Sequence, residues 1–141
     1  MEFKGQWNGA DVYDDYAHHP DEVRATIESI RASMPERRLV LAFQPHTYTR
    51  TKALLSEFAE ALSHADKVIL ADIYAARETD TLGISSEDLQ KAIADLGTEC
   101  HYFPSFDEIE NFLLENCINS DLLITMGAGD VHKIGETILG I

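Results

Sequence analysis

Short apolar runs alternate with amphipathic stretches along the whole chain, and this alternation restricts the fold more than any other feature. Residues 39–43 and 122–126 are almost entirely apolar, as expected for strands that are covered on both faces. Between such runs, apolar side chains recur every three or four residues, which is the spacing of a helix with one buried face. Five strands that are each followed by a helix predict an α/β fold with a mostly parallel sheet and helices on both faces.

The same patterns place the individual elements. We expect parallel strands at residues 12–16, 39–43, 68–71, 100–103 and 122–126, and helices at residues 20–34, 55–62, 85–96, 106–113 and 131–138. Ser85 with Asp88, and Ser105 with Glu108, have the spacing of capping boxes at helix starts. Pro20 suits a first helical turn, where its missing N–H costs nothing.

The first residues predict an additional strand. Asn8-Gly9 is a strong hairpin signal between residues 2–7 and 10–15, so the sheet should open with an antiparallel pair. The expected fold is therefore a three-layer, Rossmann-like α/β domain whose six-stranded sheet is parallel except for the N-terminal strand. Neither a linker nor a repeat interrupts the pattern, and we expect residues 1–141 to form one domain.

Charge and hydropathy exclude several classes of partner. Lysine and arginine total 11 against 25 aspartates and glutamates, and the net charge of −14 repels nucleic acids and anionic membranes. The sequence contains neither a membrane-spanning apolar run nor the apolar segment of a signal peptide, so we expect a cytoplasmic protein without membrane contact. Cys100 and Cys117 form no CxxC motif, and we expect reduced thiols without a chemical role.

Unusual residues follow the carboxyl ends of the expected strands. Ligands of open α/β sheets bind outside these ends. The segments 14–20 (DDYAHHP), 44–52 (QPHTYTRTK), 72–83 and 127–130 (GAGD) follow four of the five parallel strands, whereas the connections at the opposite edge are ordinary polar turns. This asymmetry predicts a binding site along one edge of the sheet.

Residues 46–52 are the one concentrated cationic and hydroxyl-rich stretch of this acidic chain. They lead into a helix, whose free N–H groups favour an anion. Cations at a helix N-terminus are unfavourable without a negative partner, so we favour a bound carboxylate or phosphate at Arg50 over a surface role for it. Asp14 and Asp15 suit ribose hydroxyls, but they are equally compatible with turns or helix caps.

The chain lacks a complete catalytic or phosphate-binding set. The GxG of residues 127–129 lacks the third glycine of a dinucleotide fingerprint, because position 132 is His132, and no GxxxxGK[ST] motif occurs. His18, His46 and Asp72 have side chains that can bind a metal, but we expect no metal site because nothing in the sequence indicates that they converge on one ion. His19 is the better candidate for a helix cap. These features indicate one half of a cleft whose other half belongs to another domain.

Four segments resemble, in order, motifs of the Mur ligases, the ATP-dependent amide-forming enzymes of peptidoglycan synthesis. They are DDYAHHP (14–20), FQPHTYTRT (43–51), DIYAARE (72–78) and TMGAGD (125–130). The doubled histidine, FQPH and TMGAGD are most similar to the members that join L-alanine to UDP-N-acetylmuramate. The resemblance implies the C-terminal domain of a three-domain enzyme, with the N-terminal UDP-sugar domain and the central ATPase domain absent and the isolated domain inactive.

The resemblance also implies roles for individual residues. The enzyme activates the muramoyl carboxylate with ATP as an acyl phosphate, which L-alanine then attacks. Arg50 and His18 are implied as catalytic residues, and Asp15 and Tyr16 as nucleotide-binding residues. Substrate contacts are implied for His18, His46, Arg50, Tyr74, Gly127, Ala128 and Gly129. ATP and Mg²⁺ are expected in the full-length enzyme, with none held by this domain alone. Many relatives carry arginine at position 47, so Thr47 places more weight on Arg50, and Arg77 is a second departure.

Two alternatives remain at this point. A receiver-like phosphoacceptor domain for signalling also has five strand–helix units, an acidic pair after the first and an aspartate after the third, here Asp72. It would need a lysine at the end of the fifth strand, where this chain has Met126-Gly127, and it leaves the histidine-rich loops unexplained. A metal-dependent hydrolase using His18, His46 and Asp72 is the second alternative.

Overall fold

The chain opens with the predicted antiparallel hairpin. In the computed structural model, which describes residues 1–141, β1 (Glu2–Trp7) pairs with β2 (Ala10–Asp15). Asn8 and Gly9 form the turn with φ values of 51° and 82°. Both values are positive, as a two-residue turn with the right-handed twist of its strands requires.

The remaining strands are parallel and build a six-stranded sheet. They are β3 (Leu39–Phe43), β4 (Lys67–Leu70), β5 (Glu99–Tyr102) and β6 (Leu122–Met126). The order is β1-β2-β6-β3-β4-β5, so the last strand of the chain lies in the middle of the sheet. The predicted fold class, a mostly parallel sheet with one antiparallel strand, is confirmed.

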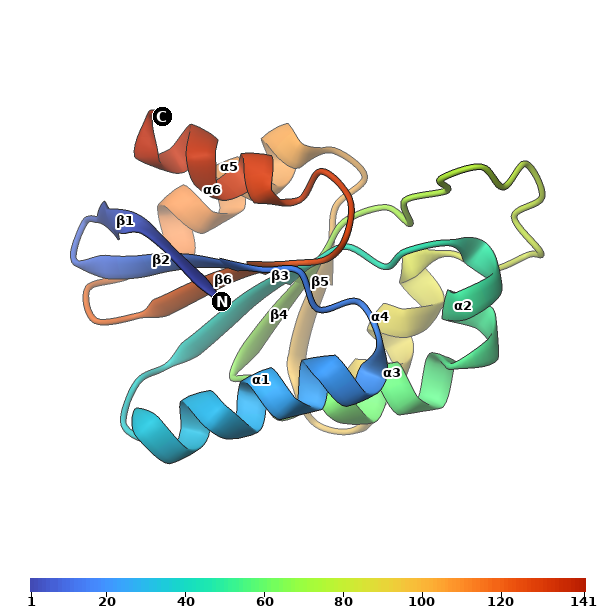
Figure 1. Cartoon of the computed structure of the whole chain (residues 1–141), viewed down its shortest axis with the longest axis horizontal. Coiled ribbons are helices and arrows are strands. Elements are labelled where there is room, and N and C mark those ends of the chain that lie inside the picture. Colours follow the sequence, from blue (N-terminus) through green and yellow to red (C-terminus); the bar gives the residue numbers. More distant parts are fainter.

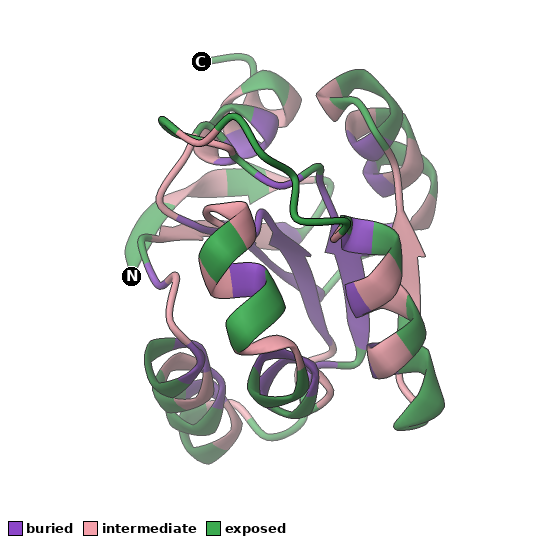
Figure 2. Ribbon diagram, turned by 90° about the vertical axis from the view of Figure 1, so that its right-hand side faces the viewer, coloured by how far each residue is buried: buried purple, intermediate pink, exposed green.

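Helices cover both faces of the sheet (Figure 1). One layer contains α1 (Pro20–Ser33), α3 (Leu55–Leu62) and α4 (Ser86–Asp95), and the other contains α5 (Phe106–Asn116) and α6 (His132–Leu139). The strands β3, β4 and β6 are the most deeply buried part of the chain, whereas the edge strands β1 and β5 are partly exposed (Figure 2). No helix is both long enough and apolar enough to cross a membrane.

The central strand β3 illustrates why this pattern gives three layers. All five of its residues are buried, and alternate side chains enter the two cores. Leu41 and Phe43 pack under α1 and α3, whereas Val40 packs toward α5 and α6. Each such side chain contributes roughly 1.5–3 kcal/mol by leaving water. A continuous apolar run is therefore stable only when helices cover both faces.

The predicted helix starts are confirmed. Ser85 and Ser105 accept hydrogen bonds from the first turns of α4 and α5 in complete capping boxes. The His19 ring accepts a hydrogen bond from the Asp21 amide at the start of α1, and the Glu22 carboxylate accepts one from the His19 amide. The interpretation of this histidine as a helix cap is correct.

The observed elements differ from the predicted ones in one place. The apolar spacing predicts a single helix at residues 55–62, and α3 has these bounds, but a short helix α2 (Tyr48–Ala53) precedes it. Leu54, with φ −117° and ψ 24°, separates the two. The bounds of the strands agree with the predicted bounds to within one or two residues.

Candidate ligand-binding site

The loops after β2, β3, β4 and β6 meet at the carboxyl edge of the sheet. The Gly127 amide donates to the Asp15 carbonyl at 3.1 Å, which joins the loops after β6 and β2. The amides of Thr47 and Tyr74 donate to the carbonyls of Tyr74 and Pro45, each at 2.8 Å, which joins the loops after β3 and β4. The unusual segments of the sequence therefore form one continuous surface.

A row of aromatic rings crosses three of these loops. The His18 and His46 ring centroids are 5.9 Å apart, and the Tyr74 ring stacks on His46 at 5.5 Å with 22° between the planes. Tyr16 contacts His18 edge-on at 5.3 Å, and Tyr16 is 69% exposed. Four of the predicted site residues are thus brought together.

Arg50 and His46 carry the two buried polar atoms without a partner. Nη1 of Arg50 and Nδ1 of His46 are shielded from solvent and form no hydrogen bond. Burial lowers the pKa of His46, and the positive charge of Arg50 lowers it further. Buried polar atoms are almost always hydrogen-bonded, and leaving one unsatisfied costs about 1–3 kcal/mol. A cation beside a neutral imidazole, each with an unpartnered nitrogen, could accommodate an anionic group.

The expectation that the helix N-terminus itself attracts an external anion is wrong. The amides of Tyr48 and Thr49 donate to the carboxylate of Glu78, and so does the Thr49 hydroxyl. The Arg50 amide donates to Oγ1 of Thr47 at 3.2 Å. The negative partner that the cations of α2 require is therefore part of the chain. The Arg50 side chain itself has no carboxylate partner within 4.0 Å.

Thr47 and Lys52 have structural contacts that the sequence analysis did not assign. Thr47 is the N-cap of α2 and adopts φ 65° and ψ 146°, a conformation that costs a non-glycine residue on the order of 1–3 kcal/mol. The ammonium of Lys52 donates to the Leu82 carbonyl at 2.9 Å. Both residues fix the loop geometry around Arg50.

The glycines after β6 are required by close contacts. A Cβ at Gly127, where φ is +148°, would lie 2.9 Å from the Gln44 carbonyl oxygen. At Gly129 it would lie 2.7 Å from Oε1 of Gln44 and 2.9 Å from the Tyr74 ring. Ala128 between them is half-buried. The loop therefore packs directly against the segments after β3 and β4.

Gln44 is a site residue that the sequence analysis did not single out. Its side chain is buried, donates from Nε2 to the Asp72 carbonyl at 3.3 Å and accepts at Oε1 from the Asp130 amide at 3.1 Å. One amide thus links the ends of β3, β4 and β6. A polar residue that directly follows an apolar strand is the signal that could have identified it.

The acidic pair after β2 has partners within the domain. The Asp15 carboxylate accepts from the Ala17 amide at 2.8 Å and from the Thr26 hydroxyl at 3.1 Å. Asp14 accepts from the Thr125 hydroxyl at 2.7 Å, and burial raises the pKa of Asp14. The alternative of a turn contact holds for Asp15, whereas Asp14 bonds across to the neighbouring strand β6, and the ribose contact of Asp15 stays a prediction.

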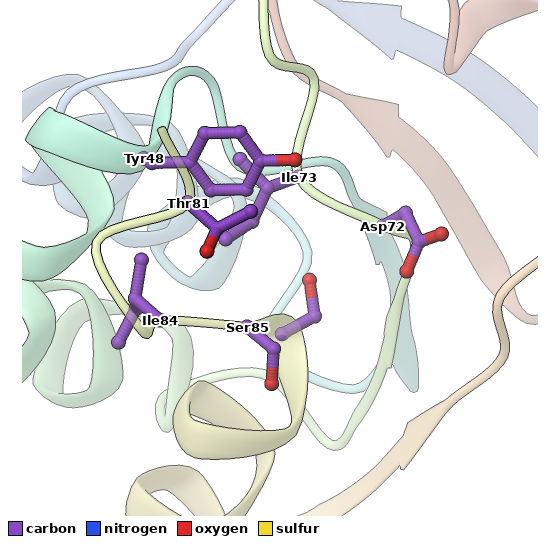
Figure 3. Close-up of a pocket in the computed structure, with 7 residues that line it drawn as sticks. Tyr48, Asp72, Ile73, Thr81, Ile84 and Ser85 are labelled. Carbon is purple, nitrogen blue, oxygen red and sulfur yellow. The ribbon is translucent and has the colours of Figure 1, made fainter. Parts of the chain in front are cut away.

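Asp72 lies away from the histidines. Its carboxylate accepts a hydrogen bond from the Tyr102 hydroxyl, whose pKa is raised to about 12 by burial and by Asp72. Asp72 also borders a cavity of about 210 Å³ beneath the long loop after β4 (Figure 3). The cavity is lined by Tyr48, Asp72, Ile73, Thr81, Ile84, Ser85 and Ser86.

The sheet order argues against the receiver alternative. Receiver-like sheets place the strand with the acidic pair next to the strand that ends in the phosphoacceptor. Here β6 and β3 separate β2 from β4, which puts Asp15 and Asp72 about 14 Å apart across the sheet at ~4.8 Å per strand. His18, His46 and Asp72 likewise do not converge, because no three His, Cys, Asp or Glu side chains are grouped for metal binding.

The ring row and Arg50 lie on an open surface. None of the four cavities in the structure is lined by His18, His46, Arg50 or Gly127. Convergent side chains without an enclosing wall are typical of a domain that forms a site together with another domain.

The fold is that of a doubly wound α/β domain, with the unpartnered nitrogens of Arg50 and His46 at the carboxyl edge of its sheet. The family model for the Mur ligase glutamate ligase domain matches residues 1–129. The chain belongs to the Mur ligase family, which confirms the resemblance carried by the four loop motifs.

Curated relatives match this chain over almost its whole length. The UDP-N-acetylmuramate–L-alanine ligase of Lachnospira eligens is 65% identical over 139 residues, covering 99% of this chain and 30% of the relative. The enzyme of the same name from Agathobacter rectalis is 60% identical over 139 residues, with the same coverage. The chain thus spans about 30% of the length of these relatives.

Solved structures share the fold. The UDP-N-acetylmuramate–alanine ligase of Thermotoga maritima superimposes with a TM-score of 0.76 at 24% identity, covering 94% of this chain and 26% of that one. The murein peptide ligase of Psychrobacter arcticus has a TM-score of 0.79 at 20% identity, covering 99% of this chain and 29% of that one.

Proposed function

We propose that this chain is the C-terminal domain of an ATP-dependent ligase that joins L-alanine to UDP-N-acetylmuramate in the cytoplasm. The observation that carries the proposal is the pair of buried, unpartnered atoms on Arg50 and His46, which lie within a family motif. The names of relatives that are 60–65% identical support the choice of substrates.

Arg50 has the chemistry that an acyl-transfer ligase needs at this edge. A planar, permanently charged guanidinium can bind a carboxylate or a phosphoryl group through two parallel hydrogen bonds. His46, whose pKa is lowered by burial and by Arg50, is neutral at pH 7 and can donate one hydrogen bond without adding charge. We infer that both stabilise the negative charge that develops at the reacting carboxyl group.

The surrounding residues complete the proposed contacts. His18, next to His46, faces the same region and serves as the second catalytic candidate. Tyr74 and the loop of Gly127, Ala128 and Gly129 border the proposed amino-acid pocket, where the glycines permit close backbone approach. Asp15 and the exposed ring of Tyr16 remain the proposed nucleotide contacts.

ATP supplies the phosphoryl group that activates the carboxylate. The chain's own residues fit only part of this cofactor, because no phosphate-binding loop occurs in the sequence and no group of metal ligands converges in the structure. We therefore assign the phosphate and Mg²⁺ contacts to the central domain of the full-length enzyme. The open surface around Arg50 would then be closed, and water excluded, only when that domain docks.

The test is reconstitution of the full-length protein. Joining this chain to the cognate N-terminal and central domains should give ADP release that requires both UDP-N-acetylmuramate and L-alanine. The isolated chain should show no such turnover. ADP release that requires neither UDP-N-acetylmuramate nor L-alanine, or that requires a different amino acid, would contradict the proposal.

A further inference from the structure

Glu78 reaches the start of α2 from a distant loop. Its carboxylate accepts hydrogen bonds from the amides of Tyr48 and Thr49 and from the Thr49 hydroxyl, across 30 and 29 residues of sequence. Hydrogen bonding from Thr49 lowers the pKa of Glu78. The carboxylate is therefore ionised throughout the neutral range.

The helix α2 satisfies only part of its first turn through its own N-cap, because the Thr47 hydroxyl accepts from the Arg50 amide alone. The helices α1, α4 and α5 each carry two acidic residues in the first turn, whereas α2 has none and instead contains Arg50 and Lys52. Six residues are too few for a helix that is stable by itself, and no acidic side chain of its own first turn is available to the amides there. The position of α2 thus depends on a carboxylate supplied from elsewhere.

The loop that supplies this carboxylate is held on both sides of Glu78. Tyr74 is bonded to the segment after β3 through both its amide and its carbonyl, and the Leu82 carbonyl accepts from Lys52 at 2.9 Å. Glu78 binds backbone amides and makes no ion pair with Arg50, since Arg50 has no carboxylate within 4.0 Å. The guanidinium therefore stays available for a ligand.

We propose that Glu78 is a positioning residue, which fixes the first turn of α2 so that Arg50 points at the reacting anion without being neutralised. This inference rests on the proposed function of Arg50. It gives the loop after β4, through Glu78, an indirect role in the ligation reaction. Glu78 acts through Arg50 and touches no reacting atom.

The contact itself can be tested on the chain as it stands. In NMR spectra, the amide signals of Tyr48 and Thr49 should titrate with an apparent pKa below the usual range of glutamate. The variant E78Q should abolish this titration, and D80N should preserve it, because Asp80 lies in the same loop but bonds only to the Leu82 amide there. Titration that persists in E78Q would overturn the contact.

The functional step is tested by a double-mutant cycle in the full-length enzyme. E78A should lower kcat at least tenfold in the wild-type background but less than twofold when Arg50→Ala is already present, because the two residues act in series. E78Q, which keeps an acceptor oxygen, should recover part of the loss, and D80N should have wild-type kcat. An equal loss in both backgrounds would show general destabilisation, and an unchanged kcat in E78A would also overturn the inference.

The outcomes separate this inference from the proposed function. If Arg50→Ala retains normal turnover, the proposed function of Arg50 fails, and the inference that rests on it fails with it. If Arg50→Ala is severely impaired but E78A is not, the inference alone is wrong.

Discussion

Arg50 differs from the other arginines in what surrounds it. Four of the remaining five form ion pairs with carboxylates, and Arg77 is exposed to solvent. The pairs are Arg24–Glu60, Arg31–Asp66, Arg37–Asp11 and Arg38–Asp121. Arg50 is partly buried and has no carboxylate partner, in a chain with 25 acidic residues. The absence of a partner in so acidic a chain is the reason why we propose that Arg50 binds an external anion.

We expect Arg50→Ala to lower kcat/KM of the full-length enzyme about 100-fold or more, a typical loss when a preorganised group that stabilises developing charge is removed. Folding should be unaffected because the guanidinium makes no internal ion pair. Steady-state ADP release measures kcat/KM, and thermal unfolding of the isolated chain measures its stability. A variant with near-normal turnover would remove Arg50 from the mechanism.

Asp121 provides a prediction for stability. Burial raises its pKa, but hydrogen bonds from Arg38 and the Ile118 amide more than offset this, so that the pKa is lowered in the folded state. A carboxyl group with a lowered pKa stabilises the fold above its unfolded pKa, and this contribution is lost as the pH falls through the folded value. Asp121→Asn should therefore cost roughly 2–4 kcal/mol at pH 7.

The same reasoning gives the pH dependence of that cost. Denaturant unfolding of wild type and Asp121→Asn should give free energies that differ fully above the usual pKa of an aspartate and converge only as the pH falls through the lower folded pKa of Asp121. Glu115→Gln, an exposed position on α5 without an ion pair, should change stability by less than about 0.5 kcal/mol at either pH. A constant difference across the pH range would contradict the assignment.

Among the elements, the loop between β6 and α6 depends most on backbone freedom. Gly127→Ala should destabilise the chain by about 2–3 kcal/mol, because it combines a disfavoured φ with a contact at 2.9 Å to the Gln44 carbonyl oxygen. Gly97→Ala is the matched control, since Gly97 also has a positive φ but no atom near the added Cβ. The difference between the two costs, measured by urea unfolding, isolates the steric part at Gly127. Equal costs would mean that the close contact is unimportant.

Local patterns were sufficient for most elements. The bounds of β3 and β6 follow directly from their apolar runs, and the capping boxes at Ser85 and Ser105 mark α4 and α5. The helix α2 could not be predicted in this way. It has no apolar stripe, and its first two amides donate to Glu78, which lies in a different loop.

At the scale of the whole molecule, an open site predicts weak binding by this chain alone. We expect 1 mM ATP to raise the midpoint of thermal unfolding by less than about 2 °C, which corresponds to a dissociation constant of about 1 mM or weaker. Differential scanning fluorimetry with and without ATP measures the shift. Micromolar affinity would contradict the assignment of the phosphate contacts to another domain.

The sequence predicted where the candidate site residues lie better than it predicted their contacts. The alternation of strands and helices identified the correct edge, because all parallel strands end there, and His18, His46 and Tyr74 are indeed neighbours. The order of the strands is a tertiary property, and it was this order that separated Asp72 from the acidic pair. The buried link through Gln44 depends on the same tertiary arrangement and was not predictable from local spacing.

The central place of β6 has a consequence for synthesis on the ribosome. The strands β2 and β3 flank β6, so neither has its parallel neighbour on that side until residues 122–126 have been made. At 5–20 residues per second, roughly 4 to 17 s pass between translation of β3 and of β6. During this interval the emerging chain presents unpaired apolar strand edges, which makes it a substrate for chaperones that bind nascent polypeptides.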